Sequence, residues 1–230
     1  MPFFYYFDPT ILIILPALIF TIWAQINVNS TFEKYKKVQT DSRITGYDAA
    51  RRILDANGLY DVKIERISGN LTDHYDPRSN VIRLSDVVHD STSAAAVGVA
   101  SHEAGHAVQH AVGYFPIKIR QAIIPVTRIG SSLAMPLFII GLILALEPFV
   151  YVGIAFYALA VLFQLITLPV EFNASRRAMS ALEGYGNLTQ EELAASRKVL
   201  SAAAMTYVAA LATALLSLLR LVVIANGRRR

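Results

Sequence analysis

The chain has 230 residues, of which 54% are hydrophobic and 17% are charged, and it contains no cysteine. The charged fraction lies below the roughly one quarter that is usual in soluble domains, which indicates a membrane protein. The lack of cysteine excludes disulfides and thiolate metal sites, so any metal must be held by histidine and carboxylate side chains. The net charge of +4 is modest and does not cluster with aromatic residues, which argues against a nucleic-acid partner.

The first predicted membrane helix lies within residues 1–29. Its uncharged stretch 10–28 is long enough, at about 1.5 Å per residue, to cross a hydrocarbon layer of ~30 Å. Neither a basic segment before it nor a small-residue cleavage site after it indicates a signal peptide, so we expect a retained anchor. The aromatic run 3–7 is typical of a membrane interface.

Residues 30–118 hold most of the turn signals and form the predicted catalytic region. Thr45 is placed to cap its first helix, and Asn57-Gly58 to end that helix. The predicted elements are a helix over 47–56, strands over 62–67 and 81–84, and a second helix from Asp90 or Ser91 to about Gly113.

The C-terminal half contains three more apolar runs. The runs 129–146 and 148–170 form a predicted membrane hairpin within residues 119–171. Residues 172–230 begin with a polar segment, in which Thr189 and Glu192 make a capping box. The last run, 199–219, either spans the membrane or packs on the catalytic region. We therefore predict a mostly α integral membrane protein with three or four membrane helices and a small α+β catalytic region.

The placement of lysine and arginine predicts the orientation of these spans. If the first three spans are correct, three basic groups fall on one side, which the positive-inside rule makes cytoplasmic. The groups are Lys34, Lys36 and Lys37; Lys118, Arg120 and Arg128; and Arg176, Arg177, Arg197 and Lys198. If the last run also spans, the basic tail 228–230 lies outside.

The strongest functional signal is His102-Glu103-Ala104-Gly105-His106, inside the predicted helix. Two histidines four residues apart project from one helix face and can share a zinc ion. Glu103 is placed to take a proton from a water that zinc acidifies to a pKa of roughly 7. Gly105 has no side chain to crowd a neighbouring element. The alternative is a pair of surface histidines, which the small apolar residues 94–100 argue against.

The third ligand of a catalytic zinc must come from elsewhere. His110 lies about 12 Å from His102 along a straight helix, which favours a hydrogen-bonding role for it instead. Glu171 is the better candidate because it is the first charge after the run 148–170. An interfacial ion pair of Glu171 with a nearby arginine fits the spacing equally well. The rival carboxylates are Glu183, Glu191 and Glu192.

Longer segments resemble the YugP-type family of membrane zinc metallopeptidases. The similar segments are 73–85, 101–109 and 168–178, and the resemblance extends over nearly the whole chain. It implies a zincin-like catalytic region with His102, His106 and Glu171 as zinc ligands and Glu103 as the catalytic base. More distantly, the chain is similar to HtpX and the CAAX prenyl proteases, which share a histidine-pair helix and a downstream glutamate ligand.

One departure from such families follows the glutamate ligand. They tend to carry an aspartate soon after it, as a hydrogen-bonding partner for a ligand, whereas this chain has Asn173 and Ser175. An amide or a hydroxyl can still orient a ligand histidine, but it adds no charge.

Substrate binding and oxyanion stabilisation need further residues. Edge strands hold extended peptides by main-chain pairing, and the predicted edge strand comprises Asn80, Val81, Ile82, Arg83 and Leu84, with Ser85 at its end. A structural strand inside a small sheet is the alternative. The candidate oxyanion donors are His74, Arg177 and Tyr207, each of which also has an ordinary structural interpretation.

The sequence thus predicts a zinc metalloendopeptidase in the cell membrane whose site faces the cytoplasm. Its partners would be a protein or peptide substrate and the lipid bilayer, and a homo-oligomer or another membrane partner is left open. One alternative is a non-catalytic scaffold or chaperone partner with a structural zinc, although a structural site has no need for Glu103. A transporter is disfavoured because the spans carry almost no ionisable residues.

Overall fold

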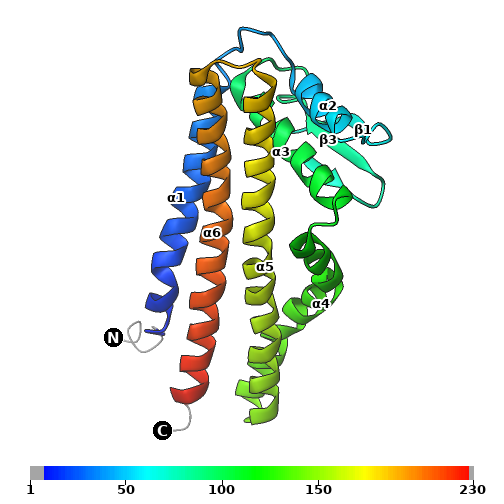
Figure 1. The fold of residues 1–230 in the computed structure, drawn as a ribbon. Helices are drawn as coiled ribbons and strands as arrows, with labels where there is room; N and C mark the ends of the chain where they lie inside the picture. The colour runs from blue at the N-terminus through cyan, green and yellow to red at the C-terminus, as the bar shows by residue number, and fades with distance from the viewer. Residues whose placement is uncertain (1–7, 228–230) are drawn as a thin grey trace. The chain divides into compact units, whose positions relative to one another are not determined.

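A computed structural model describes residues 8–227, so the aromatic run 3–7 and the basic tail 228–230 lie outside the described residues. The described part of the chain is mostly helical and has one three-stranded sheet (Figure 1). It divides into two compact units. The first comprises Met1–Ala24, Ile119–Leu168 and Thr206–Arg230, and the second comprises Gln25–Lys118 and Pro169–Met205.

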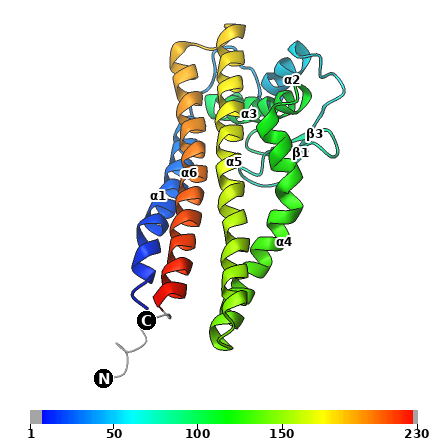
Figure 2. The same cartoon turned by 60° about the horizontal axis from the view of Figure 1, so that its bottom comes forward.

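Within residues 8–227, four helices are long and apolar enough to cross a membrane, and Figure 2 shows them from a second direction. They are α1 (Ile11–Tyr35), α4 (Phe115–Ile143), α5 (Glu147–Tyr185) and α6 (Gln190–Gly227). A helix satisfies all its backbone polar groups internally, which the hydrocarbon layer requires. The predicted fold class, a mostly α membrane protein with a small α+β region, is confirmed. Each helix extends beyond its apolar run, and α5 thereby carries Glu171 into the second unit.

Helices of the first unit approach one another at glycines. A Cβ atom on Gly153 would lie 2.8 Å from the Ala134 carbonyl oxygen, and one on Gly141 would lie 2.6 Å from the Val150 nitrogen. Small residues allow such close contact between membrane helices, where hydrophobicity alone does not drive association. Large apolar side chains of the same helices, such as that of Ile129, stay exposed in the way expected of a lipid-facing surface.

The second unit contains the sheet. Its strands are β1 (Lys63–Ile67), β2 (His74–Asp76) and β3 (Val81–Ser85), in the order β1-β3-β2. β3 pairs in parallel with β1 and antiparallel with β2. The predicted strands 62–67 and 81–84 are confirmed. β2 was not predicted, because three residues beside a turn are too few to show the alternation of a strand.

The prediction that residues 80–85 form an edge strand is wrong. β3 lies between the other two strands, so both of its edges are already paired. The side chains of Val81, Ile82 and Leu84 are buried, which suits a central strand. The edge beside the predicted metal-binding helix belongs to β2 instead.

Two helices flank this sheet in the second unit, and their caps explain where they begin. α2 (Gly46–Ala56) begins at the predicted cap, Thr45, and Asp48 completes a capping box. α3 (Ala94–Ala111) begins later than predicted, at Ser93, whose Oγ accepts a hydrogen bond from the Ala96 N–H at 3.2 Å.

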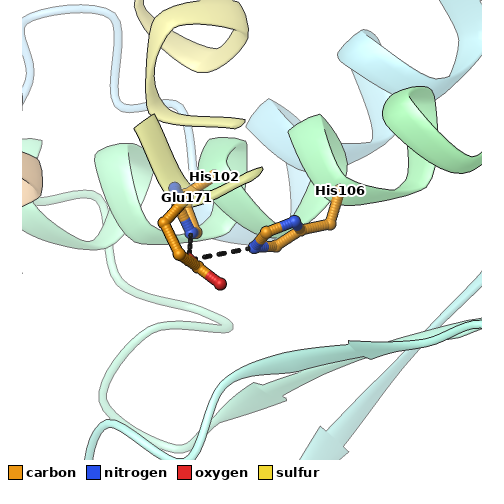
Figure 3. Close-up of side chains that lie close together, drawn as sticks. All are labelled: His102, His106 and Glu171. Carbon is orange, nitrogen blue, oxygen red and sulfur yellow. Dashed lines mark hydrogen bonds and ion pairs between the residues drawn. The ribbon is translucent and has the colours of Figure 1, made fainter. Parts of the chain in front are cut away.

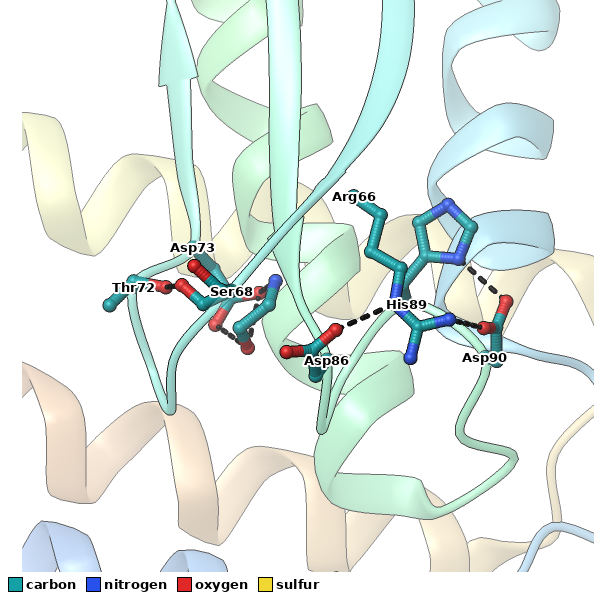
Figure 4. A network of polar contacts seen from close by, with 8 residues as sticks. Arg66, Ser68, Thr72, Asp73, Asp86, His89 and Asp90 are labelled. Atoms are coloured by element: carbon teal, nitrogen blue, oxygen red, sulfur yellow. Dashed lines mark hydrogen bonds and ion pairs between the residues drawn. The ribbon is translucent and has the colours of Figure 1, made fainter.

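Ion pairs hold the segment between β3 and α3 in place. Arg66 of β1 donates to Asp86 at 2.7 Å and to Asp90 at 2.6 Å, and His89 contacts Asp90 (Figure 4). Asp90 is therefore occupied by these two partners, which explains why it does not cap α3. Exposed pairs of this kind add little stability, but they fix the path of the chain.

α3 crosses the C-terminal part of α5 at Gly105. A Cβ atom there would lie 2.7 Å from the carbonyl oxygen of Ala174, closer than real Cβ atoms approach backbone. The expectation that Gly105 avoids crowding a neighbouring element is thus confirmed. α3 also contacts the start of α6, where the Ser196 hydroxyl donates to the Ala94 carbonyl oxygen at 2.7 Å.

Gly105→Ala should therefore destabilise the protein even though alanine is the better helix former. Helix propensity favours alanine by roughly 0.5–1 kcal/mol, whereas overpacking costs about 1–3 kcal/mol. We expect a Tm several degrees lower in thermal unfolding. Gly184→Ala is the control, because nothing lies within 4 Å of a Cβ at Gly184 in α5. An equal or higher Tm for Gly105→Ala would show that α5 can move away without cost.

Candidate metal centre

The second unit brings three of the predicted site residues together. His102 and His106 lie one turn apart on α3, with ring centroids 4.6 Å apart. Glu171 of α5 points between them, and its Oε2 lies 3.3 Å from Nε2 of His102 and 3.4 Å from Nε2 of His106 (Figure 3). One ligand atom from each residue lies within 4.8 Å of the other two.

These separations suit a shared metal ion better than direct hydrogen bonds. A charge-assisted N–H···O bond is usually about 2.7–2.9 Å long. Ligand atoms at ~2.0–2.2 Å from a tetrahedral zinc ion are about 3.3–3.5 Å from one another. Both distances from Glu171 Oε2 to the histidine nitrogens fall in the range expected of two ligands on one zinc ion. Two histidines and a glutamate are also a set of ligands that zinc accepts.

Burial supports the same interpretation. The side chain of Glu171 is 3% exposed, and those of His102 and His106 are 15% and 12% exposed. A carboxylate removed from water needs a compensating positive charge and hydrogen bonds. Neutral imidazoles supply no charge, so a divalent cation among the three side chains would supply it.

Gln109, one turn after His106, determines which nitrogen of that histidine faces Glu171. The Gln109 side-chain amide donates to the Val170 carbonyl oxygen at 2.8 Å and to Asn173 Oδ1 at 2.9 Å. Both amide hydrogens are then used, so the Gln109 oxygen accepts from the Nδ1–H of His106 at 3.0 Å. The lone pair of Nε2 is thereby left for a metal.

His102 is oriented from α5. Its Nδ1 lies 3.0 Å from the Ser175 hydroxyl, which can accept the Nδ1 proton and leave Nε2 free to coordinate. Asn173 does not contact a candidate ligand itself. Its side-chain oxygen accepts hydrogen bonds from Gln109, which contacts His106, and from Arg177. Of the two residues Asn173 and Ser175, which follow Glu171 on α5, Ser175 thus contacts a candidate ligand directly and Asn173 does so through Gln109.

Glu103 lies beside the ligands and is held by the sheet. Its Oε2 accepts a hydrogen bond from the backbone N–H of Tyr75 at 2.9 Å. Tyr75 is opposite Ile82 in β3, and its N–H points away from β3 toward α3. The unpaired edge of β2 therefore runs alongside the helix that carries the histidines.

Asp73 anchors the start of β2 to the end of β3. Its carboxylate accepts hydrogen bonds from the Ser85 backbone N–H at 2.7 Å and from the Ser85 hydroxyl. Burial raises the pKa of Asp73 and the charge of Glu103 adds to this rise, although the bonds from Ser85 oppose it. These bonds tie the residue two positions before Tyr75 to the end of β3.

Other predicted residues lie outside the three-residue group. The exposed ring of His74 contacts the Thr72 carbonyl oxygen at 2.9 Å, and the exposed His110 meets the ring of Tyr75 edge-on at 6.1 Å between centroids. Tyr207 belongs to the first unit. Roles in oxyanion binding stay predictions for His74, Arg177 and Tyr207.

The rival carboxylates have other surroundings. Glu183 pairs with Arg197. Glu192 caps α6 with Thr189, as predicted, and also accepts from the Asp41 N–H at 2.8 Å. Glu191 is exposed. Sequence reasoning missed Gln109, although its spacing of three residues from His106 places it on the same face of α3.

Comparison with known proteins agrees with this geometry. Residues 10–226 match the family model described as "Putative neutral zinc metallopeptidase". The chain is 49% identical over 219 residues to "Putative membrane protease YugP" of Bacillus subtilis (strain 168), covering 95% of this chain and 97% of that protein. No solved structure is significantly similar.

Replacing Gln109 should weaken metal binding without removing a ligand. In Gln109→Leu, His106 loses the acceptor that fixes its orientation, and losses of this kind typically cost about 10–100-fold in metal affinity. Zinc affinity measured by competition with a chelator tests this expectation. Gln39→Leu, an exposed glutamine on the same unit, is the control. Unchanged affinity in Gln109→Leu would mean that packing alone orients His106.

Zinc binding should weaken as the pH falls. Burial acts to lower the pKa of His106, but bonding to Glu171 and the nearby carboxylate charges outweigh it, so in the metal-free protein this pKa is raised above 6.5. A protonated imidazole cannot coordinate, so acid competes with zinc as the pH falls through that raised value. We expect zinc affinity to drop as the pH falls through this raised pKa. A zinc affinity that stays constant from alkaline to acidic pH would contradict the involvement of His106.

Proposed function

Since this chain belongs to the neutral zinc metallopeptidase family, we propose that it is a membrane-bound endopeptidase that hydrolyses peptide bonds in proteins. The observation that carries the proposal is the convergence of Glu171 Oε2 on the Nε2 atoms of both histidines, at 3.3 and 3.4 Å, with Glu103 beside them. A purely structural zinc site would not need a buried carboxylate next to its ligands.

The metal in this proposal is Zn²⁺, held by His102, His106 and Glu171. Three protein ligands are the usual number in a catalytic zinc site. Zinc supplies Lewis acidity and lowers the pKa of a coordinated water to roughly 7. Ser175 and Gln109 keep the two histidines in the tautomer that can coordinate.

Glu103 is the general base of the proposed mechanism. It is 8% exposed, and one of its oxygens is held by the Tyr75 N–H, which leaves the other for proton transfer. Glu103 accepts the proton of the attacking water and later delivers it to the leaving amine nitrogen. The backbone hydrogen bond holds its carboxylate in place during both transfers.

The substrate would bind as an extended segment along β2. The N–H of Tyr75 already donates to Glu103, so a peptide along this edge would pair with the remaining backbone of β2 and lie beside α3. Main-chain pairing of this type accepts many sequences, which suits an enzyme that acts on unfolded or membrane-near proteins. In this proposal β2, rather than the predicted strand over residues 80–85, is the edge strand that binds the substrate.

We place the site on the cytoplasmic side of a multi-pass membrane protein. The basic groups flanking the candidate spans support this orientation through the positive-inside rule.

Two substitutions separate catalysis from metal binding. Glu103→Gln should keep zinc and lose peptidase activity by about 10²–10⁴-fold, because only the proton acceptor is removed. Glu171→Ala should lose zinc, and activity with it. Metal analysis and hydrolysis of an unfolded protein substrate test both. Glu183→Gln is the matched control, since Glu183 pairs with Arg197 away from the site.

Full activity in Glu103→Gln would refute the mechanism. Unchanged zinc content in Glu171→Ala would place the third ligand elsewhere. Wild-type protein that holds zinc but cleaves no peptide would support the alternative of a scaffold with a structural zinc.

A further inference from the structure

Two lysines of the second unit share one aromatic ring. Lys34, near the end of α1, has its Nζ 5.3 Å from the ring centroid of Tyr35, and Lys198, near the start of α6, has its Nζ 5.8 Å from the same centroid. The two positive charges therefore lie within about one Debye length, ~10 Å at 0.1 M salt. Among the described residues, neither forms an ion pair with a carboxylate. Cation–π contact offsets only part of their repulsion.

Neighbouring basic residues differ in this respect. Lys36, two positions after Lys34, pairs with Glu33, and Arg197, next to Lys198, pairs with Glu183. Lys34 and Lys198 thus differ from Lys36 and Arg197 in lacking a carboxylate partner within residues 8–227, and both lie near the ring of Tyr35.

The same residues line a cavity of about 310 Å³. Its α1 side adds the amide of Asn27 and the hydroxyl of Thr31, and its α6 side adds the hydroxyl of Ser201. None of the described residues that line it is acidic. Two ammonium groups with nearby hydroxyl and amide donors are complementary to a phosphate group.

The sequence places this cavity at the depth of lipid headgroups. On α1, residues 11–32 are uncharged and Lys34 follows closely; on α6, Lys198 directly precedes the uncharged run 199–219. Both apolar runs thus end at the cavity. The apolar side chain of Ile26, one residue before Asn27, is 62% exposed on α1 and could contact an acyl chain.

We propose that this cavity binds the phosphate group of an anionic phospholipid, with Lys34 and Lys198 on the phosphate and the acyl chains along the apolar part of α1. A basic pocket between membrane helices is a recognised way to bind such headgroups. The bound lipid would join α1 to the start of α6. Since Ser196 of α6 bonds to the first residue of α3, it would also stabilise the unit that holds the candidate metal centre.

The test uses the full-length protein in an uncharged detergent. Phosphatidylglycerol, phosphatidylcholine and inorganic phosphate are added separately, at equal phosphate concentration, and the Tm and the number of lipids retained in native mass spectrometry are measured. We expect phosphatidylglycerol alone to raise the Tm, by about 5 °C or more near saturation. Lys34→Gln/Lys198→Gln should weaken the apparent lipid affinity at least tenfold.

Lys37→Gln/Lys63→Gln removes the same charge from exposed lysines outside the cavity and should respond like the wild type. Lys34→Arg/Lys198→Arg keeps both charges and should retain the lipid response. If the double glutamine variant does not fold, Lys34→Gln and Lys198→Gln are measured singly, and each should weaken lipid binding.

Three results would overturn the proposal. Equal lipid responses in Lys34→Gln/Lys198→Gln and in the Lys37→Gln/Lys63→Gln control would show that general surface charge is responsible. An equal effect of phosphatidylcholine would show no selection for anionic lipid. An effect of inorganic phosphate equal to that of phosphatidylglycerol would assign the site to a free anion rather than to a lipid.

Discussion

The contact between α3 and α5 at Gly105 is the packing constraint on which the candidate metal centre depends. The Ala174 carbonyl oxygen lies only 2.7 Å from the position that a Cβ atom at Gly105 would take. Glu171 and Ser175 are four residues apart on α5, so they share the helix face that meets α3. This one crossing brings a carboxylate to both histidines and a hydroxyl to His102. A larger separation of the helices would take Glu171 away from both imidazoles at once.

Hydrogen bonds then fix the orientation of the two histidine rings. Gln109 is completely buried, and each polar atom of its side chain has a partner, which is the condition under which a buried polar network is rigid. The network reaches from His106 through Gln109 to the backbone of α5, and Ser175 provides the equivalent support for His102. The ligand nitrogens are thereby oriented by the protein itself, so metal binding does not have to order them.

Local sequence signals predicted a large part of this arrangement. Some features could be predicted because each belongs to a single helix, whose repeat fixes its geometry. These features are the four-residue spacing of the histidines, the lack of a side chain at Gly105, and the caps at Thr45 and Thr189. The apolar runs predicted the helices that could span a membrane for the same reason. Glu171 was preferred from its position after an apolar run, but its approach to α3 is a tertiary contact that spacing alone could not establish.

The predictions that failed depend on pairing between distant segments. The central position of β3 follows from β2, whose three residues carry no periodic signal, and so the edge strand was assigned wrongly. α3 begins at Ser93 rather than at Asp90 because the Asp90 carboxylate already accepts a hydrogen bond from Arg66 of β1. Gln109 was overlooked because its role is defined by α5 rather than by α3.

X-ray absorption spectroscopy at the zinc edge of the purified, zinc-loaded protein tests the central claim most directly. Coordination by His102, His106 and Glu171 predicts one four-coordinate zinc with two imidazoles and two oxygen ligands at about 2.0–2.2 Å. Replacing Glu171 by alanine should remove that signal or change its oxygen shell, whereas replacing Glu183 should leave it unchanged. A first shell with a single imidazole, or an identical spectrum after the loss of Glu171, would contradict the assignment.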